Sequence, residues 1–261
     1  MTVFAGNCRA FELENLLGLK NGLPFKKKFK INNAADVEEA ATHMREEILK
    51  IGSDPISNIN ELLEENNIKI YSIEADPSFS GMSTIIDDKT GVIVFNNNNE
   101  IPLVRRRFTV LHELGHLYLD LSLFNDDEKQ IERMCDTFAG AMLLPGEKIK
   151  EYFGGKRTKV YTNELKLIKE NYGIALPAIM YRAKAFNLVT DSYLKFFMIN
   201  YNKYYRLQEK EGYEGKEETT RFIQLLIRAV AQEIITSTKA ASLNNQILGD
   251  FRKQYLDNVL K

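Results

Sequence analysis

Two histidines and a glutamate lie within five consecutive residues of this chain and could together bind a metal and hydrolyse a bond. His112, Glu113 and His116 form the pattern H-E-x-x-H. On a helix, His112 and His116 share one face because they are four residues apart, so both can bind one zinc ion. Glu113 is rotated by about 100° from His112 and can reach a water on the metal. This geometry is typical of a metallopeptidase helix with the glutamate as general base.

The residues around the motif favour a helix. Apolar side chains recur there at helical spacing, at Phe108, Leu111, Leu114, Tyr118 and Leu121. The chain has only three histidines, and two of them are in the motif. Gly115 inside a helix costs about 1 kcal/mol relative to alanine, so we expect a second helix to approach the backbone there. The alternative is a partly buried helix whose histidines form ordinary hydrogen bonds.

A catalytic zinc site needs a third protein ligand and an open fourth position. Segment 131–145 offers one, because Glu132, Asp136 and Gly140 follow one another at four-residue spacing beside an apolar helical face. We predict that Glu132 is the third ligand and that Asp136 accepts a hydrogen bond from a liganding histidine. Gly140 is expected to let this helix pack against Gly115. The alternative is that Glu132 and Asp136 form a solvated helix edge.

Two other residues are weaker candidates for the third ligand. Asp120 is four residues beyond His116 and could reach back to the metal, and Cys135 falls on the apolar face. Both rank below Glu132. Cys8 and Cys135 make no disulfide framework, which fits a reducing compartment.

The sequence around these residues resembles a known family. The run R-R-F-T-V-L-H-E-L-G-H-L-Y-L, followed by E-x-x-x-D-x-F-A-x-x-M-L-L-P, is similar to the ImmA/IrrE family of zinc metallopeptidases. The resemblance covers roughly residues 35–200, and the two motif segments carry nearly all of it. Asp136 stands where the family pattern often has asparagine, and an aspartate there should orient the ligand at least as well.

The resemblance implies a zinc-dependent endopeptidase that cleaves one specific protein, such as a DNA-binding repressor or antitoxin of a mobile element or stress response. The expected partner is therefore a helix-turn-helix regulator. Family members often carry a helix-turn-helix domain before the peptidase, and none is recognisable in the short lead of this chain. Direct binding of nucleic acid is therefore not expected.

A second interpretation of the sequence is that the protein is not an enzyme. The chain could be a non-catalytic protein-binding module with a structural or vestigial zinc site, acting through its C-terminal helices. Glu113 argues against this reading, because a structural site has no use for a general base. In the peptidase reading a further donor should stabilise the developing oxyanion, and Tyr181 and Arg182 are weak candidates for it.

Composition narrows the classes of protein further. The chain has 261 residues, of which 44% are hydrophobic and 27% charged, and its net charge is −1. These values fit a globular protein without the basic field that favours nucleic acid. No apolar run approaches the length of a membrane span, and the first residues lack the pattern of a secretion signal. We therefore expect a cytoplasmic protein.

The order of predicted elements indicates an α+β fold that is predominantly helical. A helix capped near Asn33 is expected over 33–51, followed by strands at 68–73, 82–86 and 92–95. The last two strands flank a glycine-containing turn and form a small antiparallel β-sheet just before the metal-binding helix. The strand Gly91–Asn96 is either a free edge that could pair with extended substrate or part of an ordinary hairpin.

These elements suggest three segments along the chain. Residues 1–32 form a lead segment, and residues 33–155 form a zincin-like metallopeptidase core. Residues 156–261 form a helical C-terminal region, with a charged, glycine-containing flexible linker near 208–219.

Overall fold

The computed structural model describes residues 12–19, 22–124, 127–205 and 212–257. It is α+β and predominantly helical, as predicted. The chain divides into two compact units. One is Leu23–Glu217, and the other combines Met1–Gly22 with Glu218–Lys261. No helix within the described residues is long and apolar enough to cross a bilayer.

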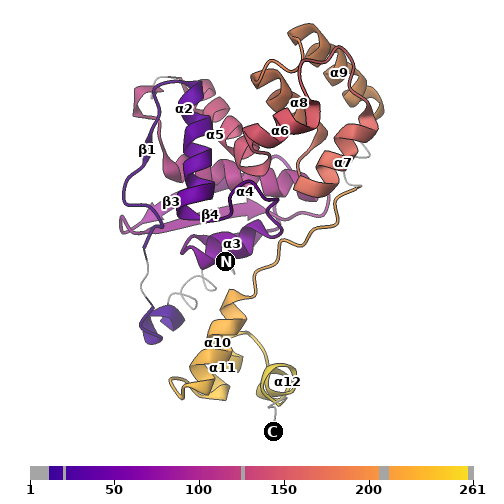
Figure 1. Ribbon diagram of the computed structural model, residues 1–261. Helices are drawn as coiled ribbons and strands as arrows, with labels where there is room; N and C mark the ends of the chain where they lie inside the picture. The colour runs from indigo at the N-terminus through magenta and orange to yellow at the C-terminus, as the bar shows by residue number, and fades with distance from the viewer. Residues whose placement is uncertain (1–11, 20–21, 125–126, 206–211, 258–261) are drawn as a thin grey trace. The chain divides into compact units, whose positions relative to one another are not determined.

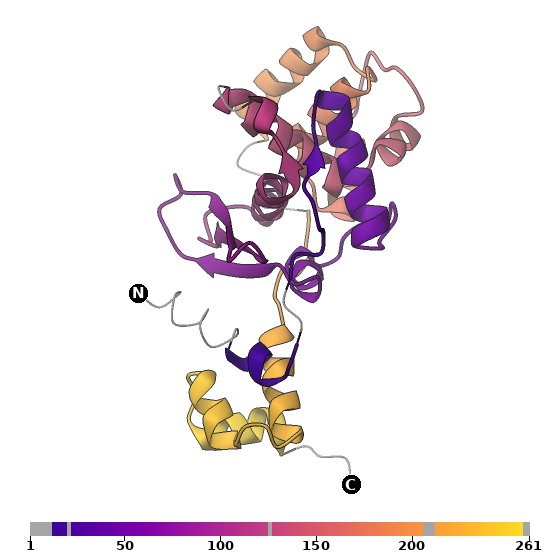
Figure 2. The same cartoon turned by 90° about the vertical axis from the view of Figure 1, so that its left-hand side faces the viewer.

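A small mixed sheet in the larger unit consists of three strands: β2 (Lys69–Ile73), β3 (Gly81–Ile86) and β4 (Thr90–Asn96). As the turn pattern predicted, β3 and β4 form an antiparallel hairpin. However, β2 pairs parallel with β4, so the sheet is not purely antiparallel. The strand order is β2–β4–β3. The apolar β4 therefore lies between the two strands that precede it in the chain. Figure 2 shows the hairpin at one side of the helices of this unit.

The prediction that the last strand offers a free edge is wrong, because β4 is the central strand. Nearly all of its residues are buried, as suits a strand that is paired on both sides. In β3, half-buried and exposed residues alternate instead. Among the described residues β3 pairs only with β4, so β3 leaves its outer edge available.

The two motif helices are α4 (Leu103–Tyr118) and α5 (Glu128–Leu143), and they pack against each other. A Cβ atom on Gly115 would lie 3.4 Å from Cα of Cys135 and 3.3 Å from Cδ1 of Phe138. This close contact confirms the predicted approach of a second helix. The predicted contact of Gly140 with Gly115 is wrong, because a Cβ atom on Gly140 would instead lie 3.0 Å from Cδ of Arg182.

The remaining helices of the larger unit surround this pair (Figure 1). On one side, α2 packs on α5. The predicted cap of α2 is present, since the side chain of Asn33 accepts a hydrogen bond from the N–H of Ala35 at 2.8 Å. On the other side, α8 packs on α5 and also contacts α6, α7 and α9. The helices are α2 (Ala34–His43), the π-helix η1 (Met44–Ile48), α3 (Ile59–Glu65), the 3₁₀ helix η2 (Ser122–Phe124), α6 (Gly146–Phe153), α7 (Thr162–Tyr172), α8 (Leu176–Ala185) and α9 (Asp191–Tyr204). A short parallel pair joins β1 (Phe29–Lys30) to β5 (Leu119–Asp120).

Part of the predicted flexible linker is packed against α4. The guanidinium of Arg107, which is 1% exposed, forms an ion pair with Glu217 and lies 4.7 Å from the ring centre of Tyr213. Glu217 also accepts a hydrogen bond from the backbone N–H of Ile59 at 2.6 Å. Residues 212–217 are therefore held by the buried charge of Arg107, a contact that periodicity along the sequence does not reveal. The rest of the predicted linker up to residue 211 lies outside the described residues.

The smaller unit is helical and takes residues from both ends of the chain. Residues 12–16 are helical, and the later elements are α10 (Arg221–Ala231), α11 (Ser237–Leu243), α12 (Leu248–Phe251) and the π-helix η4 (Arg252–Leu256). Leu13, Leu226 and Phe251 are fully buried in one shared core. The units thus divide the chain near residues 22 and 217, whereas the sequence-based segments divide it at 32 and 155. Sequence periodicity cannot show which distant segments share a core.

The side chain of Asn96 organises the loop between β2 and β3. It is 1% exposed, and its amide donates to the carbonyls of Ala75, Asp76 and Phe79 at 2.9–3.1 Å. We expect Asn96→Ala to lower the free energy of unfolding by about 1–3 kcal/mol, because buried backbone groups lose their partners. Denaturant unfolding measures this loss. Asn97→Ala is the control at a less buried position, and an equal loss in both variants would contradict the assignment.

Candidate metal centre

His112, His116 and Glu132 meet at the contact between α4 and α5. The Nε2 atoms of the two histidines are 3.1 Å apart. The carboxylate of Glu132 places Oε2 3.2 Å from Nε2 of His112 and Oε1 3.3 Å from Nε2 of His116. Each residue offers one ligand atom, and these atoms all lie within 4.8 Å of one another. The three side chains could therefore hold one metal ion.

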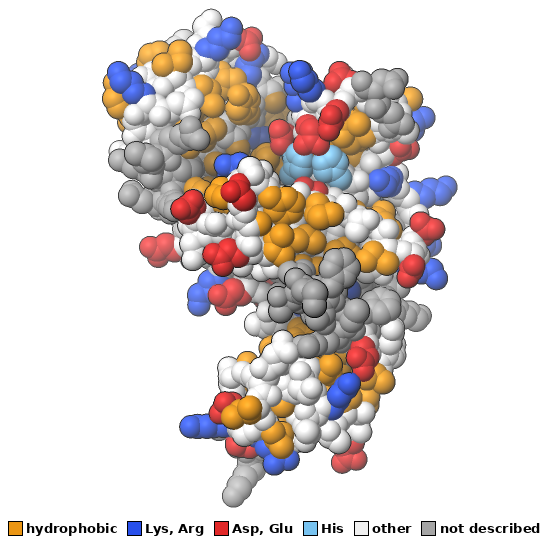
Figure 3. Space-filling model, turned by 180° about the vertical axis from the view of Figure 1, so that it is seen from behind, with side chains coloured by type: hydrophobic (Ala, Val, Ile, Leu, Met, Phe, Trp, Pro, Cys, Tyr) orange, Lys and Arg blue, Asp and Glu red, His pale blue; other side chains and the backbone are white. Residues whose placement is uncertain are grey.

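The centre is open to solvent on the Glu132 side. The side chains of His112, His116 and Glu132 are 14%, 29% and 51% exposed. Figure 3 shows histidine side chains at the surface next to acidic ones, beside a hollow with hydrophobic walls. A metal ion and a polypeptide could therefore both reach these atoms without an opening of the fold.

Asp136 contacts the far side of the His112 ring. Nδ1 of His112 lies 2.8 Å from Oδ1 of Asp136. An ionised carboxylate only accepts, so Nδ1 carries the proton and Nε2 keeps its lone pair for a metal. Burial lowers the pKa of His112, but the hydrogen bond and charge of Asp136 and the charge of Glu132 outweigh it, so the pKa is raised. Burial and the neighbouring His112 lower the pKa of His116.

Removing the Asp136 carboxylate should weaken metal binding. We expect Asp136→Ala to lower the affinity for zinc by about 10–100-fold, as is typical when the partner of a liganding histidine is lost. Asp136→Asn should lose less, because the amide oxygen can still accept from Nδ1. Competition with a chelating dye measures the affinity, and Glu128→Ala on the same helix is the control. An unchanged affinity in Asp136→Ala would show that His112 needs no such partner.

Glu113 lies outside the group of three ligand atoms, on the side of the sheet. Its carboxylate Oε2 accepts a hydrogen bond from the hydroxyl of Ser83 on β3, at 2.7 Å. Sequence reasoning did not identify Ser83, although a polar residue in a strand next to a predicted metal helix was a usable signal. Gly81 allows this contact, because a Cβ atom there would lie 2.8 Å from Cγ2 of Thr109 and 3.3 Å from Cγ of Glu113.

The structure does not bring the rival ligands to the site. Within the described part of the chain, the only group suited to a metal is the one formed by the two motif histidines and Glu132. The carboxylate of Asp120 accepts from the backbone N–H of Ser122 at 3.2 Å. Cys135 is fully buried, and burial raises the pKa of its thiol well above the usual range. The third histidine, His43, contacts the hydroxyl of Tyr118 at 2.8 Å.

The two weak candidates for an oxyanion donor differ in their surroundings. Arg182 is buried, donates to the carbonyl of Leu144 at 2.9 and 3.1 Å and forms an ion pair with Glu38, so its donors are already occupied. The side chain of Tyr181 is 57% exposed and lines the same cavity as Asp136. The structure therefore leaves only Tyr181 of the two free to approach a substrate.

Comparison with known protein families finds a match that includes both motif helices. Residues 64–184 match the family model Peptidase_M78, described as the IrrE N-terminal-like domain. The matched region contains the three-stranded sheet, both motif helices and all five predicted site residues. A match to a peptidase family, together with a His-His-Glu group that could hold a metal, indicates a metallopeptidase. No curated protein matches the chain. Residues 64–184 thus match the IrrE N-terminal-like domain, the peptidase family that the motifs of this chain resemble.

Proposed function

We propose that this chain is a zinc-dependent endopeptidase that hydrolyses peptide bonds in one specific protein. The observation that carries the proposal is the arrangement around α4. Three ligand atoms converge on one side of the helix, while Glu113 stays outside that group and is held separately by Ser83. A purely structural site would need only the first of these two features.

The donor set fits zinc. Two imidazole nitrogens and one carboxylate are a usual set for a catalytic zinc ion, with the fourth position left open. Tetrahedral donors at zinc distances lie about 3.3 Å from one another, and the distances among His112, His116 and Glu132 are 3.1–3.3 Å. Bound zinc would lower the pKa of a water towards neutrality and polarise the scissile carbonyl.

Glu113 would act as the general base and then as the general acid. Its Oε2 is held by Ser83, and its Oε1 has no hydrogen bond from a described residue, so Oε1 could accept the proton of the attacking water. The same carboxyl group would then pass a proton to the leaving amine. Tyr181 is the remaining candidate for stabilising the developing negative charge.

The outer edge of β3 would align the substrate. An extended peptide can add to a free strand edge through main-chain hydrogen bonds, and β3 offers such an edge among the described residues. Ser83 on β3 is in contact with Glu113, so a peptide along this edge would run past the general base. This assignment replaces β4 in the role expected from the sequence.

The proposal also names the class of protein that is cleaved. It rests on the resemblance to the ImmA/IrrE family, which favours a cytoplasmic helix-turn-helix regulator such as a repressor or antitoxin. The net charge of −1 agrees with a protein that acts on another protein rather than on nucleic acid directly.

The test is a comparison of new protein N-termini in source cells. Cells carrying the native protein or Glu113→Gln would be compared with and without stress. The proposal expects one or a few termini that require Glu113 and lie inside a DNA-binding regulator. If no terminus depends on Glu113 under any condition while zinc remains bound, the chain is a binding module rather than a peptidase.

A further inference from the structure

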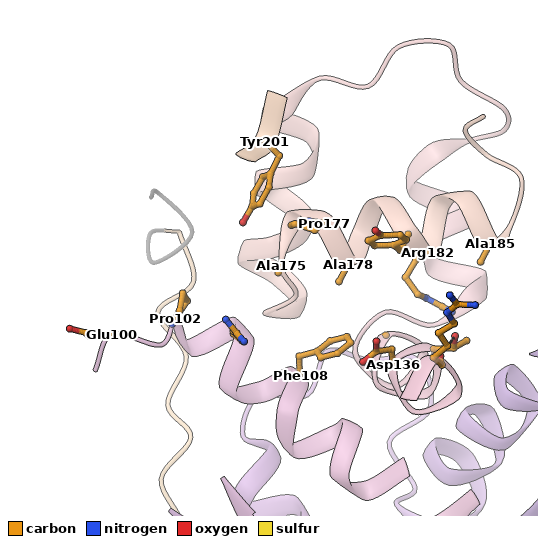
Figure 4. A pocket seen from close by; sticks show the side chains of 15 residues that line it. Glu100, Pro102, Phe108, Asp136, Ala175, Pro177, Ala178, Arg182, Ala185 and Tyr201 are labelled. Carbon is orange, nitrogen blue, oxygen red and sulfur yellow. Dashed lines mark hydrogen bonds between the residues drawn. The ribbon is translucent and has the colours of Figure 1, made fainter. Parts of the chain in front are cut away.

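A cavity of about 940 Å³ lies in the larger unit, between the α4–α5 pair on one side and α8 and α9 on the other. Figure 4 shows Phe108 on α4 and Asp136 on α5 facing Ala178 and Pro177 on α8. A cavity of this size holds a drug-sized ligand or a short peptide segment rather than one ion. Its role is not explained by metal binding or by the proton transfer at Glu113.

The cavity lies beside the metal centre, because Asp136 belongs to the lining of the cavity and also contacts His112. Asp136, which lines it, is the residue whose Oδ1 lies 2.8 Å from Nδ1 of His112. Phe108, which also lines it, is four residues before His112 on α4 and therefore on the same side of that helix. A polypeptide with its scissile bond at the metal centre would therefore have the cavity directly beside it.

The walls of the cavity select for apolar groups. Figure 4 shows Phe108 across the cavity from Ala178, and the lining also includes the small residues Ala185 and Gly140. Such walls leave room for a large aliphatic or aromatic group from elsewhere. The buried Arg182 does not change this preference, because its charge is already paired with Glu38.

Two cations of the lining have no acidic partner in the described part of the chain. Arg105 and Arg133 are exposed, and neither forms an ion pair with another described residue. The lining also includes two carboxylates. One, Asp136, is occupied by His112, and Figure 4 shows the other, Glu100, pointing away from the cavity. The free charges that a ligand would meet are therefore positive.

We propose that this cavity is a specificity subsite of the peptidase and binds a large apolar side chain beside the scissile bond, with a neighbouring acidic side chain at Arg105 or Arg133. The inference rests on the proposed function and adds the class of sequence that is cleaved. The substrate would thus carry an acidic residue next to a large apolar one at the cleavage site.

The test uses the zinc-loaded full chain and a peptide library made by digesting a whole cell proteome. Cleavage sites are read by mass spectrometry. Ala178→Leu narrows the cavity opposite Phe108 and should shift the preferred residue to a smaller side chain. Arg133→Glu should lower cleavage next to acidic residues about tenfold and favour basic ones, because like charges repel.

Matched controls keep the readout specific. Ala231→Leu makes the same substitution at an exposed alanine of α10, and Lys129→Glu makes the same change of charge on α5 outside the cavity. Both should cleave with the native preference. In a Glu113→Gln background, Ala178→Leu should also weaken binding of the best-cleaved peptide about tenfold by fluorescence anisotropy.

The outcomes separate the two proposals. If the native protein cleaves with a clear preference that Ala178→Leu and Arg133→Glu leave unchanged, with zinc content and fold retained, the cavity is not a subsite and the peptidase assignment stands. If the native protein cleaves no peptide and binds none, both proposals are overturned.

Discussion

Replacing Glu113 by glutamine is expected to slow peptide-bond hydrolysis by about 10²–10⁴-fold, the usual contribution of a positioned general base. The amide cannot take up the proton of the attacking water. It can still accept the hydrogen bond from Ser83, because its oxygen can replace Oε2 of the carboxylate. The side chain should therefore keep its position while losing its chemistry.

The measurement is a single-turnover rate on the substrate identified in cells, together with zinc content by atomic absorption. Glu113→Gln should bind one zinc ion per chain, as the native protein should. Glu128→Gln, at an exposed glutamate in the first turn of α5, is the matched control and should cleave at the native rate. Full activity in Glu113→Gln would remove Glu113 as the base.

Replacing Glu132 by alanine is expected to lower the affinity for zinc by more than about 100-fold. Loss of a residue that only orients a ligand already costs about 10–100-fold, and Glu132 would itself be a ligand. Its two oxygens lie 3.2 and 3.3 Å from Nε2 of His112 and of His116. Without it, two histidines on one helix would have to hold the ion alone.

Zinc content after dialysis and competition with a chelating dye both measure this loss. Thermal unfolding gives a second readout, because a ligand at 100 times its dissociation constant stabilises the folded state by about 2.7 kcal/mol. Glu132→Ala should lose this stabilisation, whereas Glu128→Ala on the same helix should keep it. Unchanged zinc content in Glu132→Ala would exclude Glu132 as a ligand.

The motif residues were accessible to sequence reasoning because their geometry is local. Helical spacing alone places His112 and His116 on one face, and the same spacing aligns Glu132 with Asp136. The glycine in α4 indicated that a second helix approaches there, and the structure places Cys135 and Phe138 against it. The family resemblance added that the two helices belong to one site.

Contacts between distant segments were not accessible in this way. The position of β4 at the centre of the sheet depends on which strands pair, and the chain order of the strands does not specify this pairing. The error about the substrate edge follows from it. Ser83 was missed for the same reason, because its role depends on the packing of β3 against α4.

The sequence by itself predicted the chemistry that we propose for this protein: a pair of histidine ligands and a general base on one helix, and a carboxylate ligand on the next. Only the tertiary structure decided what surrounds that chemistry, namely the edge of β3, the cavity beside Asp136 and the pairing of Arg107 with Glu217. The physical reason is that helical periodicity relates residues three or four positions apart, whereas these features join residues that are far apart in the chain and meet only when the core forms.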